Sequence, residues 1–328
     1  MKKIILIGVL AIICQGFSFK ADPKEKIPYL DSKLSIEKRV DDLMKRMTLE
    51  EKVAQMNQYV GLEHMRSAEN DLTEEELKRN TARGFYPGFT SKDIAAMTEK
   101  GLVGSFLHVL TAEEANQLQQ LAAKSRLKIP LLIGIDAIHG NAMVAGCTVY
   151  PTNIGLASAF DPALVEKISR QTALEMRATG SQWTFNPNVE IARDPRWGRV
   201  GETFGEDTYL VTQMGVASVK GYQGADYSGT DKVLACIKHF MGGTPLNGTN
   251  GAPADLSERT IREVYFPPYE AGVKAGAFTL MTAHNEVNGI PSHSNKWLMT
   301  DVLRKEWGFK GFIVSDWMDI EHIHDLHH

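Results

Sequence analysis

Cysteine is scarce in this chain, which has three in 328 residues. Only Cys147 and Cys236 lie beyond the first twenty residues, both in apolar or glycine-rich stretches, so we expect two buried free thiols rather than a disulfide framework. An excess of charge of either sign is also absent, because the formal net charge is −4. This balance does not favour nucleic acid or an anionic membrane surface as a partner. After residue 20, no stretch of the sequence is long and apolar enough to span a bilayer.

The first twenty residues differ from the rest of the chain. Lys2 and Lys3 precede an apolar run over residues 4–13, and small residues follow it. This is the layout of a secretory signal peptide, so we assign residues 1–20 to one and expect export to the periplasm or the extracellular space. Two alternatives stay open: a buried first helix, and a lipid anchor at Cys14, for which the preceding isoleucine is a poor match.

Apolar, strand-like runs alternate with helical patterns along most of the chain. Strands are expected at 102–109, 130–137, 183–192, 232–240, 278–285 and 311–317, with a weaker candidate at 155–160. Helices are expected at 35–47, 48–56, 111–126, 161–180, 207–224, 257–276 and 295–308. Thr48 and Glu51 form a capping-box pattern, and the helix after Asp161 begins with Pro162 and stops at Gly180.

This alternation predicts an α/β fold with crossover helices and a parallel sheet. Runs such as PLLIGI and KVLACI are continuously apolar, as strands buried on both faces are. A doubly wound open sheet is one solution, but no glycine-rich phosphate loop follows the first strand. We therefore favour a TIM-like (β/α)8 barrel for residues 21–328.

Polar residues follow the apolar part of four expected strands. These residues are Asp136, Lys238, His239, His284, Asn285, Asp316 and Trp317. In an α/β barrel the carboxyl ends of all strands open on one face, which holds the active site. Each residue alone has an ordinary structural explanation, such as a helix cap or a buried histidine. Together they predict one polar site, because burying so many polar groups without a function is costly.

Two chemistries fit this set. In the first, a carboxylate attacks or stabilises an electron-poor carbon, while Asp136 and the Lys238–His239 pair bind the hydroxyls of a sugar and Trp317 borders its apolar face. In the second, a metal ion activates water, as in barrel metallohydrolases. The metal set would be His239, His284 and Asp316, with His108 as a further ligand. The only His-x-His pair, His322 and His324, lies beyond the last strand.

Several long motifs carry a family resemblance. The stretches TLEEKVAQM, GIDAIHG, ARDPRWGRVGETFGED, KHFMGG and the run from IREVYFPPYE to GFIVSDW resemble glycoside hydrolase family 3, in its β-glucosidase-like branch. The resemblance covers nearly all of the chain after the signal segment. It implies a retaining, exo-acting β-glycosidase with an N-terminal barrel, acting on terminal β-D-glucosyl residues of an oligosaccharide or β-glucoside and needing no cofactor.

The same motifs imply roles for single residues. Asp316 of SDW corresponds to the catalytic nucleophile, and Asp136 of GIDAIHG to the carboxylate that holds distal sugar hydroxyls. Arg199 of DPRWGR, and Lys238 with His239 of KHF, correspond to further sugar-binding residues. Trp317 falls where an aromatic ring commonly borders the subsite.

Two other arginines of this stretch have a structural interpretation. Arg193 and Arg196 are expected to brace Asp194 and Glu202 beneath the site.

The sequence departs from the family pattern at two places. His284 stands where relatives commonly have tyrosine, and a histidine there changes charge near neutral pH. It is expected to lie in the substrate site and to affect the pH optimum. The segment KHFMGGTP has Met241 and Gly243 where the hexosaminidase branch has KHFPGHG, which argues against N-acetylglucosaminidase activity.

The resemblance also bears on the proton donor. In the β-glucosidase branch the acid/base is a glutamate from a second, α/β sandwich domain, which we expect to be absent here, with the barrel incomplete at its C-terminus. No motif places Glu202, Glu286 or Glu321 as the acid. The chain alone is expected to be inactive or very weak on ordinary glycosides. The alternative is a non-catalytic, sugar-binding remnant.

Overall fold

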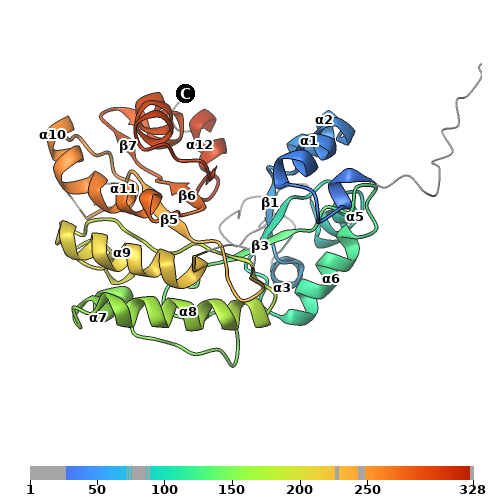
Figure 1. Cartoon of the computed structure of the whole chain (residues 1–328), viewed down its shortest axis with the longest axis horizontal. Helices are drawn as coiled ribbons and strands as arrows, with labels where there is room; N and C mark the ends of the chain where they lie inside the picture. Colours follow the sequence, from blue (N-terminus) through green and yellow to red (C-terminus); the bar gives the residue numbers. More distant parts are fainter. Residues whose placement is uncertain are drawn as a thin grey trace, which may run out of the picture. The chain divides into compact units, whose positions relative to one another are not determined.

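The computed structural model describes residues 27–71, 73, 75, 86, 89–225, 229–242 and 248–325. The expected signal segment and Gly243 lie outside these residues. The chain divides into two units, Met1–Lys52 and Val53–His328. Both units are included in Figure 1, where colour follows the sequence.

The first unit holds two helical segments and the start of a third. They are η1 (Pro28–Leu30), α1 (Ile36–Arg46) and the beginning of α2 (Leu49–Ala54). The expected capping box is confirmed: Glu51 Oε2 accepts from the Thr48 amide at 2.9 Å, and Thr48 Oγ1 accepts from the Glu51 amide at 3.2 Å. Along α1, Ile36, Val40 and Met44 repeat at four-residue spacing and are exposed.

The second unit is built on two parallel sheets that continue one another. Strands β1 (Gln58–Val60), β2 (Ser105–Leu107), β3 (Leu132–Ile135) and β4 (Trp183–Thr184) form the first sheet in that order. Strands β5 (Cys236–Phe240), β6 (Thr279–Thr282) and β9 (Phe312–Val314) form the second. Parallel bridges from Trp183 to Leu234 and from Asn188 to Lys238 join the two.

Every parallel strand therefore lies beside its predecessor in the chain. This is the winding of a TIM-like barrel, whereas a doubly wound sheet reverses its strand order. Among the described residues, β1 and β9 each pair on one side only. A short antiparallel hairpin, β7 (Glu286–Val287) with β8 (Ile290–Pro291), follows β6.

Helices occupy the crossovers between successive strands. They are α3 (Leu62–Asp71), α5 (Ser91–Glu99), α6 (Ala112–Ala122), α7 (Asn153–Ala157), α8 (Pro162–Ala178), η3 (Val200–Glu202), α9 (Thr208–Gln223), α10 (Glu258–Thr260), η4 (Ile261–Tyr265), α11 (Phe266–Lys274), η5 (Ser292–Ser294) and η6 (Trp297–Glu306). A further helix, α12 (Asp319–Asp325), follows β9. The expected start and stop of α8 are confirmed, because Asp161 caps the Leu164 amide and Gly180 has a φ of 97°. No helix within the described ranges is both long and apolar enough to cross a membrane.

Three expectations for the strands were wrong. The weak candidate at 155–160 overlaps helix α7, and β1 was not foreseen. The strand expected at 183–192 ends at Thr184. Beyond it, the amides of Asn188 and Glu190 donate to the side chains of Asn186 and Asn188, while other backbone groups still pair with β5, so the sheet ladder is interrupted.

The two cysteines are free thiols, as expected. Cys236 is buried in β5, and burial raises the pKa of its thiol to about 12. Cys147 is only half-buried, so the expectation of full burial was wrong for this residue.

Helices α8 and α9 run side by side (Figure 1) and pack closely at Gly221. A Cβ atom at Gly221 would lie 2.3 Å from the Glu166 carbonyl oxygen and 2.6 Å from Ser169 Cβ. Only a residue without a side chain lets the two helices approach to this distance.

We expect Gly221→Ala to lower the free energy of unfolding by about 1–3 kcal/mol, the usual cost of overpacking. Gly155→Ala is the matched control, since Gly155 is also helical and a Cβ there would meet nothing closer than 3.4 Å. Urea unfolding of both variants measures the difference. Equal stability of the two variants would contradict the close packing.

Candidate active site

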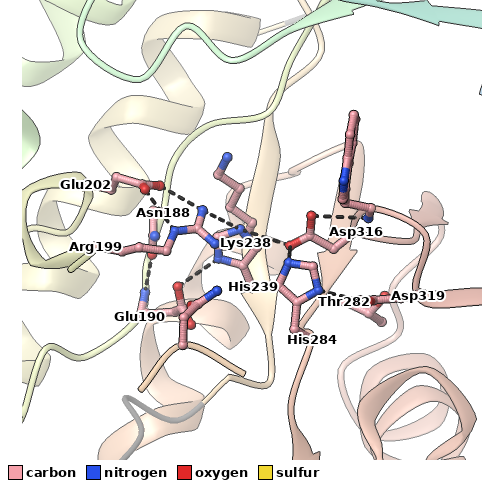
Figure 2. Close-up of polar contacts among 12 residues, drawn as sticks. Asn188, Glu190, Arg199, Glu202, Lys238, His239, Thr282, His284, Asp316 and Asp319 are labelled. Atoms are coloured by element: carbon pink, nitrogen blue, oxygen red, sulfur yellow. Dashed lines mark hydrogen bonds and ion pairs between the residues drawn. The ribbon is translucent and has the colours of Figure 1, made fainter. Parts of the chain in front are cut away.

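The side chains expected at the strand ends do lie at one end of the parallel strands. Asp136 follows β3, Lys238 and His239 belong to β5, His284 follows β6, and Asp316 follows β9. Arg199 joins them from the loop between β4 and α9. Figure 2 shows Glu202 and Arg199 on one side of this cluster, Asp319 on the other, and Asp316 with His284 between them.

Trp317 has a different environment from the other predicted residues. Its ring is partly buried and packs against the hydrophobic cluster of the first sheet, which includes Val60 and Phe106. Its backbone amide donates to Asp316 Oδ1 at 3.2 Å, so the residue also fixes the carboxylate.

The first polar group joins three strand ends. Lys238 Nζ donates to Asp136 Oδ1 at 2.6 Å, and His108 Nε2 lies 2.9 Å from Asp136 Oδ2. The Lys238 side chain is 3% exposed and that of Asp136 is 28% exposed. Burial opposes ionisation of Asp136, but the charge of Lys238 and the contact with His108 outweigh it and hold the pKa well below its ordinary range.

The sign of this pKa shift sets the pH range over which Asp136 stabilises the fold. Ionised Asp136 is favoured in the folded state. Its contribution is therefore present above about pH 4, near the ordinary value, and is lost as the pH falls through the folded pKa.

The second polar group is a chain of four side chains. Arg199 donates to Glu202 through Nε at 2.8 Å and Nη2 at 2.9 Å. Arg199 Nη2 also lies 3.0 Å from His239 Nε2, and His239 Nδ1 lies 2.7 Å from Glu190 Oε2. A guanidinium is always a donor, so His239 Nε2 must accept and its Nδ1 carries the proton.

The electrostatics of this chain favour an uncharged histidine. Burial and the neighbouring charges of Arg199 and Lys238 lower the pKa of His239 well below its ordinary value. Burial raises the pKa of Glu190 to about 8. His239 therefore presents a fixed tautomer and no added charge to the site.

The two oxygen atoms of the Asp316 carboxylate differ in their hydrogen bonding, since Oδ1 accepts from the Trp317 amide. Its Oδ2 atom is buried and, among the described residues, has no hydrogen-bond partner. His284 Nε2 lies 3.1 Å from this oxygen and His239 Nε2 lies 3.6 Å from it. Burial raises the pKa of Asp316, although the charges of His284, Lys238 and Arg199 oppose the increase. A carboxylate oxygen held in this way is available to attack a ligand atom.

A small pocket opens beside Asp316. Its lining residues are Glu190, Trp197, Arg199, His239, Asn250, Gly251, Ala283, His284 and Asn285. Two of them, His239 and His284, contact Asp316 directly. The pocket is therefore polar and is bordered by both a cation and uncharged donors and acceptors, as a site for a polyol would be.

Sequence reasoning missed Glu190 and Asp319, and it placed His108 in a metal set rather than on Asp136. A signal for Glu190 was present, because an acidic residue inside the apolar stretch NPNVEIA needs a buried partner. The prediction that Arg193 and Arg196 brace Asp194 and Glu202 was half right. Arg196 does pair with Asp194 at 2.6 Å, but the partner of Glu202 is Arg199.

The metal alternative finds no support in the arrangement. Within the residues that the structure describes, no group of three or more His, Cys, Asp or Glu side chains is placed to hold a metal ion. His239 and His284 each turn a nitrogen atom toward the same oxygen of Asp316, and His108 contacts Asp136 instead.

Comparison with known proteins decides the family. Residues 48–328 match the glycosyl hydrolase family 3 N terminal domain. The chain belongs to this family. It is 38% identical over 280 residues to the periplasmic β-glucosidase of Salmonella typhimurium, a match that covers 84% of the chain. It is 44% identical over 237 residues to a β-xylosidase of Formosa agariphila, covering 69% of the chain. The chain spans about a third of the length of these curated relatives, 33% of each.

Solved structures agree with the family 3 assignment. The β-glucosidase of Listeria innocua in complex with glucose superposes with a TM-score of 0.75 at 34% identity, covering 88% of this chain and 38% of the other. A β-glucosidase of Erythrobacter marinus gives a TM-score of 0.78 at 33% identity, covering 92% and 38%. These likenesses confirm the expected α/β, TIM-like barrel class.

The buried ion pair of this family 3 chain gives an asymmetric prediction. We expect Asp136→Asn to lower the free energy of unfolding at pH 7 by about 3 kcal/mol, because it leaves the Lys238 ammonium buried without a counter-charge. Lys238→Met should cost less, about 1–2 kcal/mol, because Asp136 is partly exposed and keeps His108. Chemical denaturation compares them, and a larger loss for Lys238→Met would contradict this account.

Proposed function

We propose that this family 3 chain provides the sugar site and the nucleophile of a retaining β-glycosidase that acts on terminal β-D-glucosyl residues. The observation that carries the proposal is the Oδ2 atom of Asp316, which is buried, accepts no hydrogen bond from the described residues and lies next to a polar pocket. In a retaining mechanism such a carboxylate attacks the anomeric carbon and forms a glycosyl-enzyme, which water then hydrolyses.

The other predicted residues suit the binding of a sugar ring. Asp136 accepts hydrogen bonds and Lys238 donates them, so the pair can hold two adjacent hydroxyls. Arg199 and His239 border the pocket as a cation and a neutral imidazole. The edge of Trp317 that is not packed against the core would face the apolar side of the ring.

The relatives support a sugar as the ligand. Solved structures of the Listeria innocua β-glucosidase contain glucose and, in a mutant, laminaribiose. The Formosa agariphila relative is named a β-xylosidase, so xylosides are the second substrate class to test. Export is proposed too, since the Salmonella typhimurium relative is named periplasmic.

Proton donation to the leaving group needs a second carboxyl about 5–5.5 Å from the nucleophile. Two glutamates near Asp316 are already engaged, Glu190 with His239 and Glu202 with Arg199. We therefore propose that the acid/base residue is not one of these two. General acid assistance is worth about 10²–10⁴ in rate, so substrates with excellent leaving groups are the ones on which this chain should react.

The test is covalent trapping of the nucleophile. The chain is incubated with 2,4-dinitrophenyl 2-deoxy-2-fluoro-β-D-glucoside, and its intact mass is then measured and its peptides are mapped. We expect one sugar per chain, on Asp316, and none on an Asp316→Asn variant. An adduct on another residue, or none on a chain with a cooperative thermal transition, would contradict the proposal. The second outcome would favour a sugar-binding protein without turnover, which glucose binding measured by calorimetry would then identify.

A further inference from the structure

Asp319 is a buried carboxylate to which the proposed function gives no role. It is the first residue of α12, and its side chain is 5% exposed. Three histidines meet it: His284 Nδ1 lies 2.8 Å from Oδ1, His322 Nδ1 lies 3.2 Å from Oδ1, and His293 Nε2 lies 3.4 Å from Oδ2. These histidines come from the segment after β6, from α12 and from η5. Because histidines from three elements contact it, the Asp319 carboxylate is held in one position.

His284 lies between Asp319 and Asp316 (Figure 2). Its Nδ1 atom contacts Asp319 Oδ1 at 2.8 Å, and its Nε2 atom contacts Asp316 Oδ2 at 3.1 Å. A neutral imidazole carries one N–H and would leave one of the two carboxylates facing a lone pair. Only the doubly protonated imidazolium offers a proton to both.

The other charged neighbours of His284 act against that protonation. Arg199 is a cation on the Asp316 side, and burial of the ring also disfavours charge. His239, which is neutral, approaches the same oxygen of Asp316 at 3.6 Å. The hydrogen bond that His284 Nδ1–H donates to Asp319 and the charge of Asp316 overcome these effects, so the pKa of His284 is raised above its ordinary value. Asp319 itself stays ionised, because contacts with His284 and His293 outweigh its burial and lower its pKa.

We propose that Asp319 is a positioning residue that acts through His284: it fixes the imidazole and keeps it protonated, so that a cation stays 3.1 Å from Oδ2 of Asp316. This inference rests on the proposed role of Asp316 as nucleophile. The imidazolium keeps Asp316 ionised while its Oδ2 atom accepts no hydrogen bond from the residues that the structure describes. Asp319 itself does not touch the substrate.

The arrangement predicts that the rate of the reaction at Asp316 falls at high pH, which gives its pH profile a basic limb. As the pH rises through the raised pKa, His284 loses a proton. The remaining proton stays on Nδ1, which donates it in a hydrogen bond to the ionised Asp319. Nε2 then presents a lone pair to Asp316 Oδ2. The Asp316 carboxylate loses its neighbouring cation, and the rate of sugar transfer to Asp316 falls.

Asp319→Asn removes the negative charge and keeps an oxygen that can accept from Nδ1–H. His284 then releases its proton at lower pH, and we expect the basic limb to move down by about one pH unit or more, the usual effect of one close charge. Asp319→Glu retains the charge, so its basic limb should lie close to that of the unmutated chain. Asp325→Asn is the matched control, because it removes a carboxylate from the exposed part of the same helix. It should leave the limb in place.

Two measurements on the full chain test the proposal. The first is the rate of labelling of Asp316 by the 2-fluoro glucoside as a function of pH, in all four proteins. The second is the titration of the histidine side chains by NMR after ¹⁵N-histidine labelling, with the His284 signal assigned by its loss in His284→Gln. We expect His284 to titrate above about pH 6.5, its ordinary value, and to titrate lower in Asp319→Asn alone.

The outcomes separate this inference from the proposed function. Equal basic limbs and equal His284 titrations in the unmutated chain and Asp319→Asn would overturn the positioning role. No labelling at any pH, together with a lowered His284 titration in Asp319→Asn, would overturn the nucleophile and leave the electrostatic coupling in place. If Asp319→Asn does not fold, the unmutated chain decides, because a His284 pKa at or below its ordinary value would overturn the proposal. Equal damage by Asn and Glu at position 319 would show a purely structural residue.

Discussion

The candidate site depends on the parallel register of β5, β6 and β9. Thr279 pairs with Phe312 and Met281 with Val314, so the residues that follow β6 and β9 emerge side by side. Gly311 permits this approach, since a Cβ there would lie 1.9 Å from the Phe278 carbonyl oxygen. A slip of one residue would turn every side chain of β9 to the opposite face and separate Asp316 from His284.

Once the register is set, charge compensation decides the state of each group. Lys238 is nearly inaccessible to water and has its counter-charge in Asp136. Arg199 is held by Glu202 and in turn fixes the tautomer of His239. These groups satisfy one another, and Asp316 Oδ2 is left without a hydrogen bond from any residue that the structure describes. Most polar groups of the site therefore have partners, whereas Asp316 Oδ2 and Asp319 Oδ2 are buried oxygens without a hydrogen bond in the described part of the chain.

The sequence predicted the site residues that lie at the ends of strands. Asp136, Lys238, His239, His284 and Asp316 were found because each follows an apolar run, and parallel strands bring such positions together. Arg199 was found through the motif DPRWGR and not through any periodicity. The structure brings all six into contact with at least one other member or with a shared partner.

The features that the sequence did not predict depend on contacts between residues far apart in the sequence. Glu190 binds a histidine 49 residues away, and Asp319 binds His284 35 residues away, so neither of these two pairings has a local signal. Strand β1 has three residues and is defined by its pairing with β2 rather than by its own pattern. Beyond the short β4, two backbone amides donate to asparagine side chains and interrupt the ladder, which propensity alone does not reveal.

Helix α1 has a consequence for handling the chain. Ile36, Val40 and Met44 form an exposed apolar stripe on it, and Glu37, Lys38 and Asp41 lie on the same helix. Salts such as sulfate strengthen the burial of apolar surface, and cooling weakens it. If copies of the chain associate through this stripe, the association would therefore strengthen with sulfate and with warming and weaken in the cold. Low temperature and low salt are the conditions that favour contact of this stripe with water.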